Sequence, residues 1–235
     1  MASSVQSKRV RKSPEERRSE IVSAAAAIAL SEGLECITVR RVADELEVRP
    51  GLIGHYFPVT EDLVAEAFGV AATAELDELI PAEHPPDGPA ERPPGSPDER
   101  PPDGPAERLA RFFSLTAGDS YDGISRLWLN ARHLSRYRPA LADRVTRQEA
   151  LWRDRLSGLI REGSEAGVFH TDDPVETAVQ ILVVLDGLGA HANTDRGDRS
   201  PTVANMAVTT AERELGLPKG SLLTLMPAAG THRAR

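Results

Sequence analysis

The sequence predicts an all-α protein with a small N-terminal helical domain and a larger C-terminal helical domain. Apolar residues recur every three or four positions through most of the 235 residues. Helix-start patterns, in which serine or aspartate precedes proline and glutamate, begin at Ser13 and at Asp173. One segment rich in proline and glycine interrupts this periodicity between the two domains. The hydrophobic content of 40% and the chain length allow a sizeable core.

The first predicted helix follows a capping box at Ser13 and carries proline at its first position. One apolar face repeats along it, and Gly33 is expected to end it. Residues 1–13 precede this helix as a basic arm without any structural pattern. Such an arm is either a solvated terminus or a segment that lies along DNA phosphates or in a minor groove. Its four bases stand close together: Lys8, Arg9, Arg11 and Lys12.

The segment from Thr38 to Phe57 predicts two short helices joined by a tight turn, within a domain of residues 14–58. Thr38 is a good N-cap residue, and Pro50 can open the second helix. The second helix should turn Ile53 and Phe57 inward. This pattern is typical of a helix-turn-helix, whose second helix enters the DNA major groove, although an ordinary helical hairpin shares it. Four residues should face outward: Arg49, Leu52, His55 and Tyr56.

The net charge of −8 argues against general affinity for nucleic acid, but the charge is unevenly distributed. Residues 1–56 hold nine Lys/Arg and eight Asp/Glu, a net charge of +1, which leaves −9 for the rest. The N-terminal domain is therefore the part of the chain that suits a DNA partner.

A connecting helix is predicted over residues 59–80, and the composition then changes. Residues 85–108 form three tandem octads, of which the first and third both read Pro-Pro-Asp-Gly-Pro-Ala-Glu-Arg. We expect residues 81–107 to be a disordered insertion, because proline and glycine at this density exclude helix and strand. Slippage-type expansion of a tolerated loop explains the repeat more simply than a docking site for a polyproline-binding partner.

Residues 108–216 predict the C-terminal helical domain. The helix over 174–190 is apolar nearly all round, which predicts burial on every face, including contact with a second subunit. Pro201 opens the last strong helix, and residues 217–235 are expected to form a loosely held tail. The last helix has a stripe of small residues suited to close helix packing: Ala204, Ala207, Val208, Ala211 and Leu215.

Several classes of protein are not expected from this sequence. Cys36 is the only cysteine, which excludes an intrachain disulfide and fits a reducing cytoplasm. No segment is expected to be long and apolar enough to span a bilayer, and glutamates interrupt the basic residues that could resemble a secretory signal. No two of the six histidines have ligand spacing on one helix, and no nucleophile or phosphate-binding motif occurs. We therefore expect no catalytic residue, no metal site, no cofactor and no enzyme activity.

Residues 14–68 resemble the DNA-binding domain of the TetR family of bacterial repressors in the spacing of helices and caps. The motif Gly-Leu-Ile-Gly-His-Tyr-Phe at 51–57 is most similar to the BetI-type branch. The C-terminal helices resemble the effector-binding and dimerisation domain of that branch more loosely, around 163–169 and at Asp186. Gly54 and Thr60 depart from the family pattern, which usually has tyrosine and lysine there.

This resemblance implies a cytoplasmic, nucleoid-associated bacterial repressor that binds a palindromic double-stranded operator as a homodimer. A small-molecule effector would bind among the C-terminal helices and release the DNA. A quaternary amine is one conceivable effector, because the branch responds to choline and aromatic faces attract such cations. The alternative is a helical small-molecule-binding protein with weak or lost DNA affinity, as the departures at Gly54 and Thr60 suggest.

Two sets of candidate site residues follow. Arg40 and Arg49 are expected to read bases or a minor groove, whereas His55 and Tyr56 suit phosphates. Asp186 is the one acid in an otherwise apolar helix, and it either bonds a neighbouring helix, the favoured interpretation, or holds a cationic effector. The DNA-contact candidates are Lys8, Arg9, Thr38, Arg40, Arg49, Pro50, Gly51, Leu52, His55, Tyr56 and Thr60. The effector-contact candidates are Phe112, Trp128, His133, Trp152 and Asp186.

Overall fold

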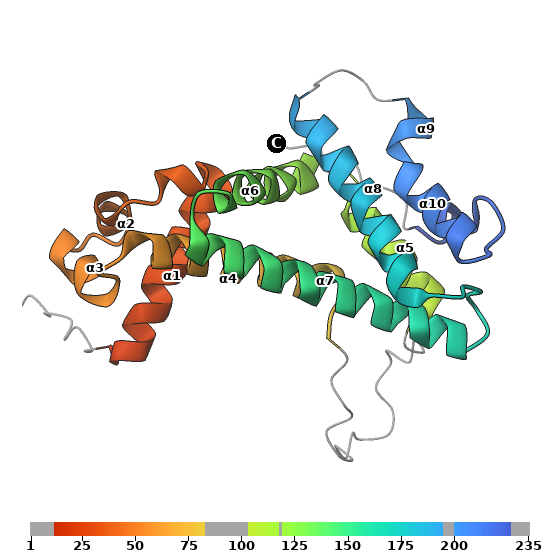
Figure 1. Ribbon diagram of the computed structural model, residues 1–235, viewed down its shortest axis with the longest axis horizontal. Coiled ribbons are helices and arrows are strands. Elements are labelled where there is room, and N and C mark those ends of the chain that lie inside the picture. The colour runs from red at the N-terminus through yellow and green to blue at the C-terminus, as the bar shows by residue number, and fades with distance from the viewer. Residues whose placement is uncertain (1–11, 83–102, 118, 195–199, 227–235) are drawn as a thin grey trace, which may run out of the picture.

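The computed structural model describes residues 12–82, 103–117, 119–194 and 200–226, and all regular structure within them is helical (Figure 1). This confirms the predicted all-α fold. The basic residues Lys8 and Arg9 and most of the proline-rich insertion lie outside the described residues. The N-terminal domain contains α1 (Pro14–Ser31), the 3-10 turn η1 (Leu34–Cys36), α2 (Val39–Glu45) and α3 (Pro50–Tyr56).

The caps of α1 are those predicted from the sequence. The Ser13 hydroxyl accepts a hydrogen bond from the Glu16 backbone N–H at 3.1 Å, and the Glu16 carboxylate accepts one from the Ser13 N–H at 2.7 Å. Gly33 has a φ of 110°, a conformation that glycine adopts without strain, and its N–H donates to the last carbonyls of the helix. The start and end of α1 are therefore encoded locally.

The helix-turn-helix also forms as predicted. Thr38 caps α2 by accepting from the Arg41 N–H at 3.0 Å, and Pro50 is the first residue of α3. Glu47 lies in the turn with a φ of 52°. Ile53 and Phe57 are buried, which fixes the opposite face of α3 outward.

Helix α4 (Thr60–Leu79) connects the two ends of the molecule. It packs against α1 in the N-terminal domain and against α7 (Pro139–Glu165) in the C-terminal domain. Helices α8 (Pro174–Thr194) and α10 (Met206–Glu214) lie at the end opposite α2 and α3 (Figure 1). Any signal between these ends therefore passes along α4 or the helices packed on it.

The predicted boundary of the insertion is wrong at its C-terminal side. Helix α5 spans Pro105–Leu115, so the last four residues of the third octad are helical. Proline at the first helical position lacks only an N–H that would be unpaired there, and Leu109 and Phe112 anchor the helix in the core.

Helix α6 (Asp119–Ser135) follows. In α7, Gly163 lies within the helix, and Gly167, with a φ of 71°, follows its end.

The last strong helix and the tail also differ from the prediction. Asn205 separates α9 (Pro201–Ala204) from α10, and Ala204 is exposed. The rest of the small-residue stripe is buried against this chain's own helices, so it is not available as an intersubunit surface. The tail contains α11 (Ser221–Leu225), which the buried Glu212 carboxylate holds by accepting from the N–H groups of Gly220 and Leu222 at 2.8 and 3.0 Å.

Helix α8 is not buried on every face within one chain. Val175, Val179 and Val183 form an exposed stripe, and Val183 is 63% exposed. The helix has the length and composition of a membrane span, with a mean hydropathy of 1.3 over its most apolar 18 residues, so the expectation that no segment would qualify was wrong. Core helices of soluble proteins pass the same test, and α8 packs against α6, α7 and α10.

Candidate functional site

The outward face of α3 forms the first candidate site. Arg49, Pro50, Gly51 and His55 are exposed, whereas Leu52 is only half-exposed. A Cβ atom added at Gly51 or at Gly54 would meet no atom within 4 Å. The face is therefore open along its length, and the absence of a side chain at position 54 lets another molecule approach the helix backbone.

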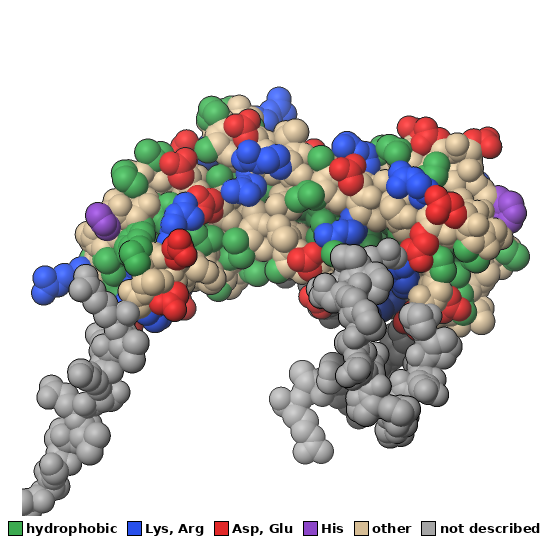
Figure 2. Space-filling view, turned by 90° about the horizontal axis from the view of Figure 1, so that it is seen from below, with side chains coloured by type: hydrophobic (Ala, Val, Ile, Leu, Met, Phe, Trp, Pro, Cys, Tyr) green, Lys and Arg blue, Asp and Glu red, His purple; other side chains and the backbone are tan. Residues whose placement is uncertain are grey.

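The other DNA-contact candidates surround this face. Arg40 is exposed on α2, and Thr38 is exposed while it caps the same helix. Tyr56 is half-buried against the core, with its ring at an edge-to-face distance of 5.4 Å from His55. Thr60 is the half-buried first residue of α4. On the face shown in Figure 2, acidic and basic side chains are interspersed, so that face has no broad basic surface.

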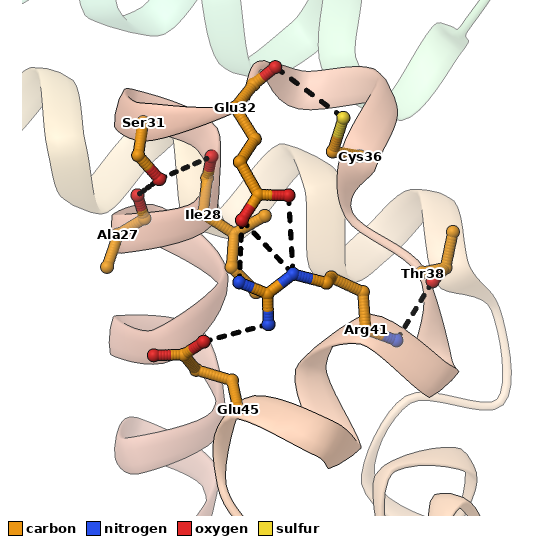
Figure 3. Close-up of polar contacts among 8 residues, drawn as sticks. All are labelled: Ala27, Ile28, Ser31, Glu32, Cys36, Thr38, Arg41 and Glu45. Carbon is orange, nitrogen blue, oxygen red and sulfur yellow. Dashed lines mark hydrogen bonds and ion pairs between the residues drawn. The ribbon is translucent and has the colours of Figure 1, made fainter.

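Arg41 fixes the position of α2 on α1 (Figure 3). Its guanidinium reaches the Glu32 carboxylate after the end of α1 at 2.6 Å and the Glu45 carboxylate of α2 at 2.8 Å. Both carboxylates raise the pKa of Arg41. Arg41 therefore has a structural role, unlike its exposed neighbour Arg40.

The second candidate site is a cavity of about 260 Å³ between α6, α7 and α8. Its wall is partly aromatic. The ring centroids of Trp128 and Trp152 are 6.2 Å apart in an edge-to-face arrangement, and each side chain is almost fully buried. On its other side, Trp128 packs edge-to-face on Phe68 of α4. Trp128 therefore packs against two aromatic rings. The charged and aromatic residues of the lining are Tyr121, Trp128, Arg132, Glu149, Trp152, Arg153 and Asp186.

An ion-pair network crosses this cavity. The Arg132 guanidinium contacts the Glu149 carboxylate of α7 at 2.9 Å and the Asp186 carboxylate of α8 at 2.8 Å. Its central carbon lies 5.1 Å from the Trp128 ring centroid, a cation–π contact. Burial opposes the charge of Arg132, but the two carboxylates outweigh it and raise the pKa of the guanidinium. Burial raises the pKa of Asp186 against the effect of Arg132.

Glu75 of α4 connects this cavity to the helix that reaches the N-terminal domain. Its side chain is buried, and one carboxyl oxygen accepts a hydrogen bond from the Trp128 indole at 2.8 Å. The other oxygen has no hydrogen-bond partner among the residues that the structure describes. Burial raises the pKa of Glu75 to about 8, while the Trp128 bond opposes this shift. The cavity wall is thus bonded to a carboxyl group whose protonated form is favoured by burial.

The structure brings together three of the five predicted effector-contact residues. Trp128, Trp152 and Asp186 line the cavity, and Asp186 also pairs with a neighbouring helix, as the structural interpretation of this residue predicted. Phe112 is instead fully buried in the core, and His133 is exposed outside the cavity. The structure therefore places these two predicted residues outside the cavity, because α5 and α6 turn them away from it.

Helical spacing could have identified the cavity residues that the prediction omitted. Tyr121 precedes Trp128 by seven positions and Arg132 follows it by four, so all three share one face of α6. On α7, Glu149 lies three positions before Trp152 and four positions before Arg153, spacings that place Glu149 beside both residues on the helix surface. Among the residues that the structure describes, no group of three potential metal ligands occurs.

Comparisons with known proteins agree with this architecture. Residues 105–215 match the family described as the BetI-type transcriptional repressor, C-terminal domain. A search of curated proteins finds no significant match. Solved structures match over nearly their whole length.

A TetR-family transcriptional regulator from Rhodococcus sp. aligns with a TM-score of 0.66 at 20% identity, over 86% of this chain and 99% of that chain. A TetR transcription regulator from Haloarcula marismortui aligns with a TM-score of 0.63 at 20% identity, over 86% and 97%. A transcriptional regulator from Saccharomonospora viridis in complex with choline aligns with a TM-score of 0.61 at 23% identity, over 84% and 95%. The chain therefore has the fold of TetR-family transcriptional regulators, and its residues 105–215 are similar to the C-terminal domain of BetI-type transcriptional repressors.

Proposed function

We propose that this protein is a sequence-specific DNA-binding repressor that acts as a homodimer and leaves its operator when a small molecule binds. The observation that carries this proposal is a chain of contacts from the cavity to the N-terminal domain. Trp128 in the cavity wall is bonded to Glu75 of α4, and α4 packs on α1. A ligand that shifts this wall can therefore change the position of the N-terminal domain.

The proposed DNA contacts are of two kinds, those to base edges or a minor groove and those to phosphates. Arg49 is exposed at the start of α3 and Arg40 at the start of α2, where long guanidinium side chains reach base edges or a minor groove. His55, exposed near the end of α3, would contact a phosphate. Lys8 and Arg9, which precede the described residues, would add charge without sequence preference.

The exposed stripe on α8 supports the homodimer. Val175, Val179 and Val183 lie one turn apart and continue the face to Gly187, which is also exposed. A second copy would cover this apolar surface, and a two-fold axis would present the two α3 helices to the two halves of a palindromic operator. The neighbouring stripe on α10 contributes to the core of each subunit instead.

The proposed effector is a small organic cation. The cavity joins aromatic faces to the carboxylates of Glu149 and Asp186, which is the chemistry that attracts such cations. The structurally similar regulator from Saccharomonospora viridis was solved with choline, so choline is the first compound to test. Binding would favour a dimer whose α3 helices no longer match successive major grooves.

The test is a mobility shift with the DNA upstream of the protein's own gene, with and without choline. Arg49→Ala should weaken operator binding by about 1–3 kcal/mol and random DNA much less, since a base contact is lost. Arg161→Ala is the matched control, because Arg161 is exposed on α7, far from α3. Equal loss on both DNAs would make Arg49 a phosphate contact.

A helical binding protein without operator affinity is the second candidate, favoured by Gly54 and Thr60, which lack the side chains usual in the family. The same experiment separates the two functions. No sequence-dependent shift at low salt, together with retained ligand binding, would support the second candidate.

A further inference from the structure

Arg132 occupies the position in the cavity that a cationic ligand would use. Its guanidinium lies on the face of Trp128 and contacts a carboxylate on each side, Glu149 at 2.9 Å and Asp186 at 2.8 Å. An aromatic face flanked by two acids is the arrangement that binds an organic cation. In this chain the Arg132 guanidinium is that cation.

We propose that Arg132 is an internal competitor of the effector, and that a small organic cation binds by displacing its guanidinium from Trp128. This inference rests on the effector site proposed above. It also assigns a regulatory role to Arg132, because the competition sets how much ligand is needed before the regulator responds.

The charges of the lining favour displacement by a cation. The four ionised residues that face the cavity, Arg132, Arg153, Glu149 and Asp186, sum to zero. A bound cation with Arg132 still in place would meet no excess negative charge. If the Arg132 guanidinium turns away, Glu149 and Asp186 lose their ion-pair partner, and the incoming cation takes its place. An anion would instead have to displace both carboxylates from Arg132.

The surroundings allow Arg132 to move while the site remains in place. One-third of the Arg132 side chain is exposed, so its flexible stem can carry the guanidinium into water. Trp128 and Trp152 are 7% and 6% exposed, and Trp128 is also held by Glu75. The aromatic wall is therefore formed before the ligand arrives.

Displacement would also change how the helices are tied. Arg132 of α6 bridges to α7 through Glu149 and to α8 through Asp186. A small cation that displaces Arg132 cannot itself link the three helices, so these ion pairs are lost. The hydrogen bond from Trp128 to Glu75 of α4 stays intact. A competitor that occupies the site nine-tenths of the time lowers the apparent affinity tenfold. The response threshold is thus adjustable through one side chain.

The experiment is isothermal titration of the full chain with choline and with tetramethylammonium. Arg132→Met keeps most of the stem and removes the competing charge, so we expect choline to bind at least tenfold more tightly than to the wild type. Arg153→Met is the matched control, because Arg153 lines the same cavity but does not lie over Trp128. If the gain came only from net charge, both variants would gain equally.

A second change tests the acids. Glu149 is half-exposed, so Glu149→Gln should fold, and in the Arg132→Met background it should weaken choline binding about tenfold. Melting curves of each variant without ligand check the fold. The inference is wrong if Arg132→Met binds choline no better than the wild type, if Arg153→Met gains as much, or if no variant binds either cation.

Operator binding without ligand, measured in parallel, separates this inference from the proposed function. The wild type is expected to bind operator DNA, and the variants are compared with it. If no variant shifts operator DNA but Arg132→Met still gains choline affinity, the competitor is real and the repressor function is wrong. If the wild type binds the operator but Arg132→Met gains no choline affinity, the competitor role of Arg132 is wrong and the repressor function stands.

Discussion

Replacing Glu75 by glutamine should change how the stability of the protein depends on pH. Glu75 is only 8% exposed, and one of its oxygens has no hydrogen-bond partner in the described part of the chain, so the charged form is disfavoured in the folded state. Burial raises its pKa from 4.5 to about 8. The folded protein therefore holds this proton more tightly than the unfolded chain does.

The sign and size of the effect follow from that difference. The contribution of the Glu75 proton to the free energy of unfolding is complete below about pH 4.5. It is lost as the pH rises through about 8, because ionising Glu75 then opposes folding. At 1.36 kcal/mol per pKa unit, the free energy of unfolding of the wild type should fall by roughly 2–3 kcal/mol between pH 6 and pH 9 on this account. Glu75→Gln has no proton to lose, and its amide oxygen can still accept from Trp128.

The assay is urea denaturation of the wild type and Glu75→Gln from pH 6 to pH 9. The stability difference between them should shift in favour of the variant as the pH rises, whatever its sign at pH 6. Glu78→Gln is the control, because Glu78 is exposed one turn further along α4. Parallel curves for the wild type and Glu75→Gln would refute the reasoning, since they would mean that Glu75 is ionised throughout this range.

Three further predictions test other parts of the structure. Val183→Arg should yield monomers in analytical ultracentrifugation, because a charge would be buried at the proposed interface, whereas Val70→Arg, at an exposed valine of α4, should stay dimeric. Arg41→Ala should lower the melting temperature slightly but operator affinity more, because the contacts that orient α2 on α1 are lost; unchanged affinity would contradict this. Deleting residues 85–100 should leave melting temperature and operator affinity nearly unchanged, because closing a long surface loop costs little entropy; a large loss of either would show that the repeat packs or docks.

Only some residues of the candidate site could be predicted from the sequence. Asp186 was notable as an acid within an apolar helix, and Trp128 and Trp152 as rare aromatic residues. The sequence could not show that Arg132 lies between two acids, because those acids come from different helices. Glu75 gave no signal either, since a glutamate on a helix is ordinary until its surroundings exclude water.

Most of the helices, and the caps at Ser13, Thr38, Gly33 and Asp173, could be predicted from the sequence alone, because capping and helical periodicity depend on residues within one or two turns. Tertiary structure decided what each apolar face covers. The small-residue stripe of α10 became part of this chain's core, while the valines of α8 remained exposed. Periodicity shows that a face must be buried, but the partner that buries it depends on how distant helices pack. The cavity and the charges around it arise from that packing alone.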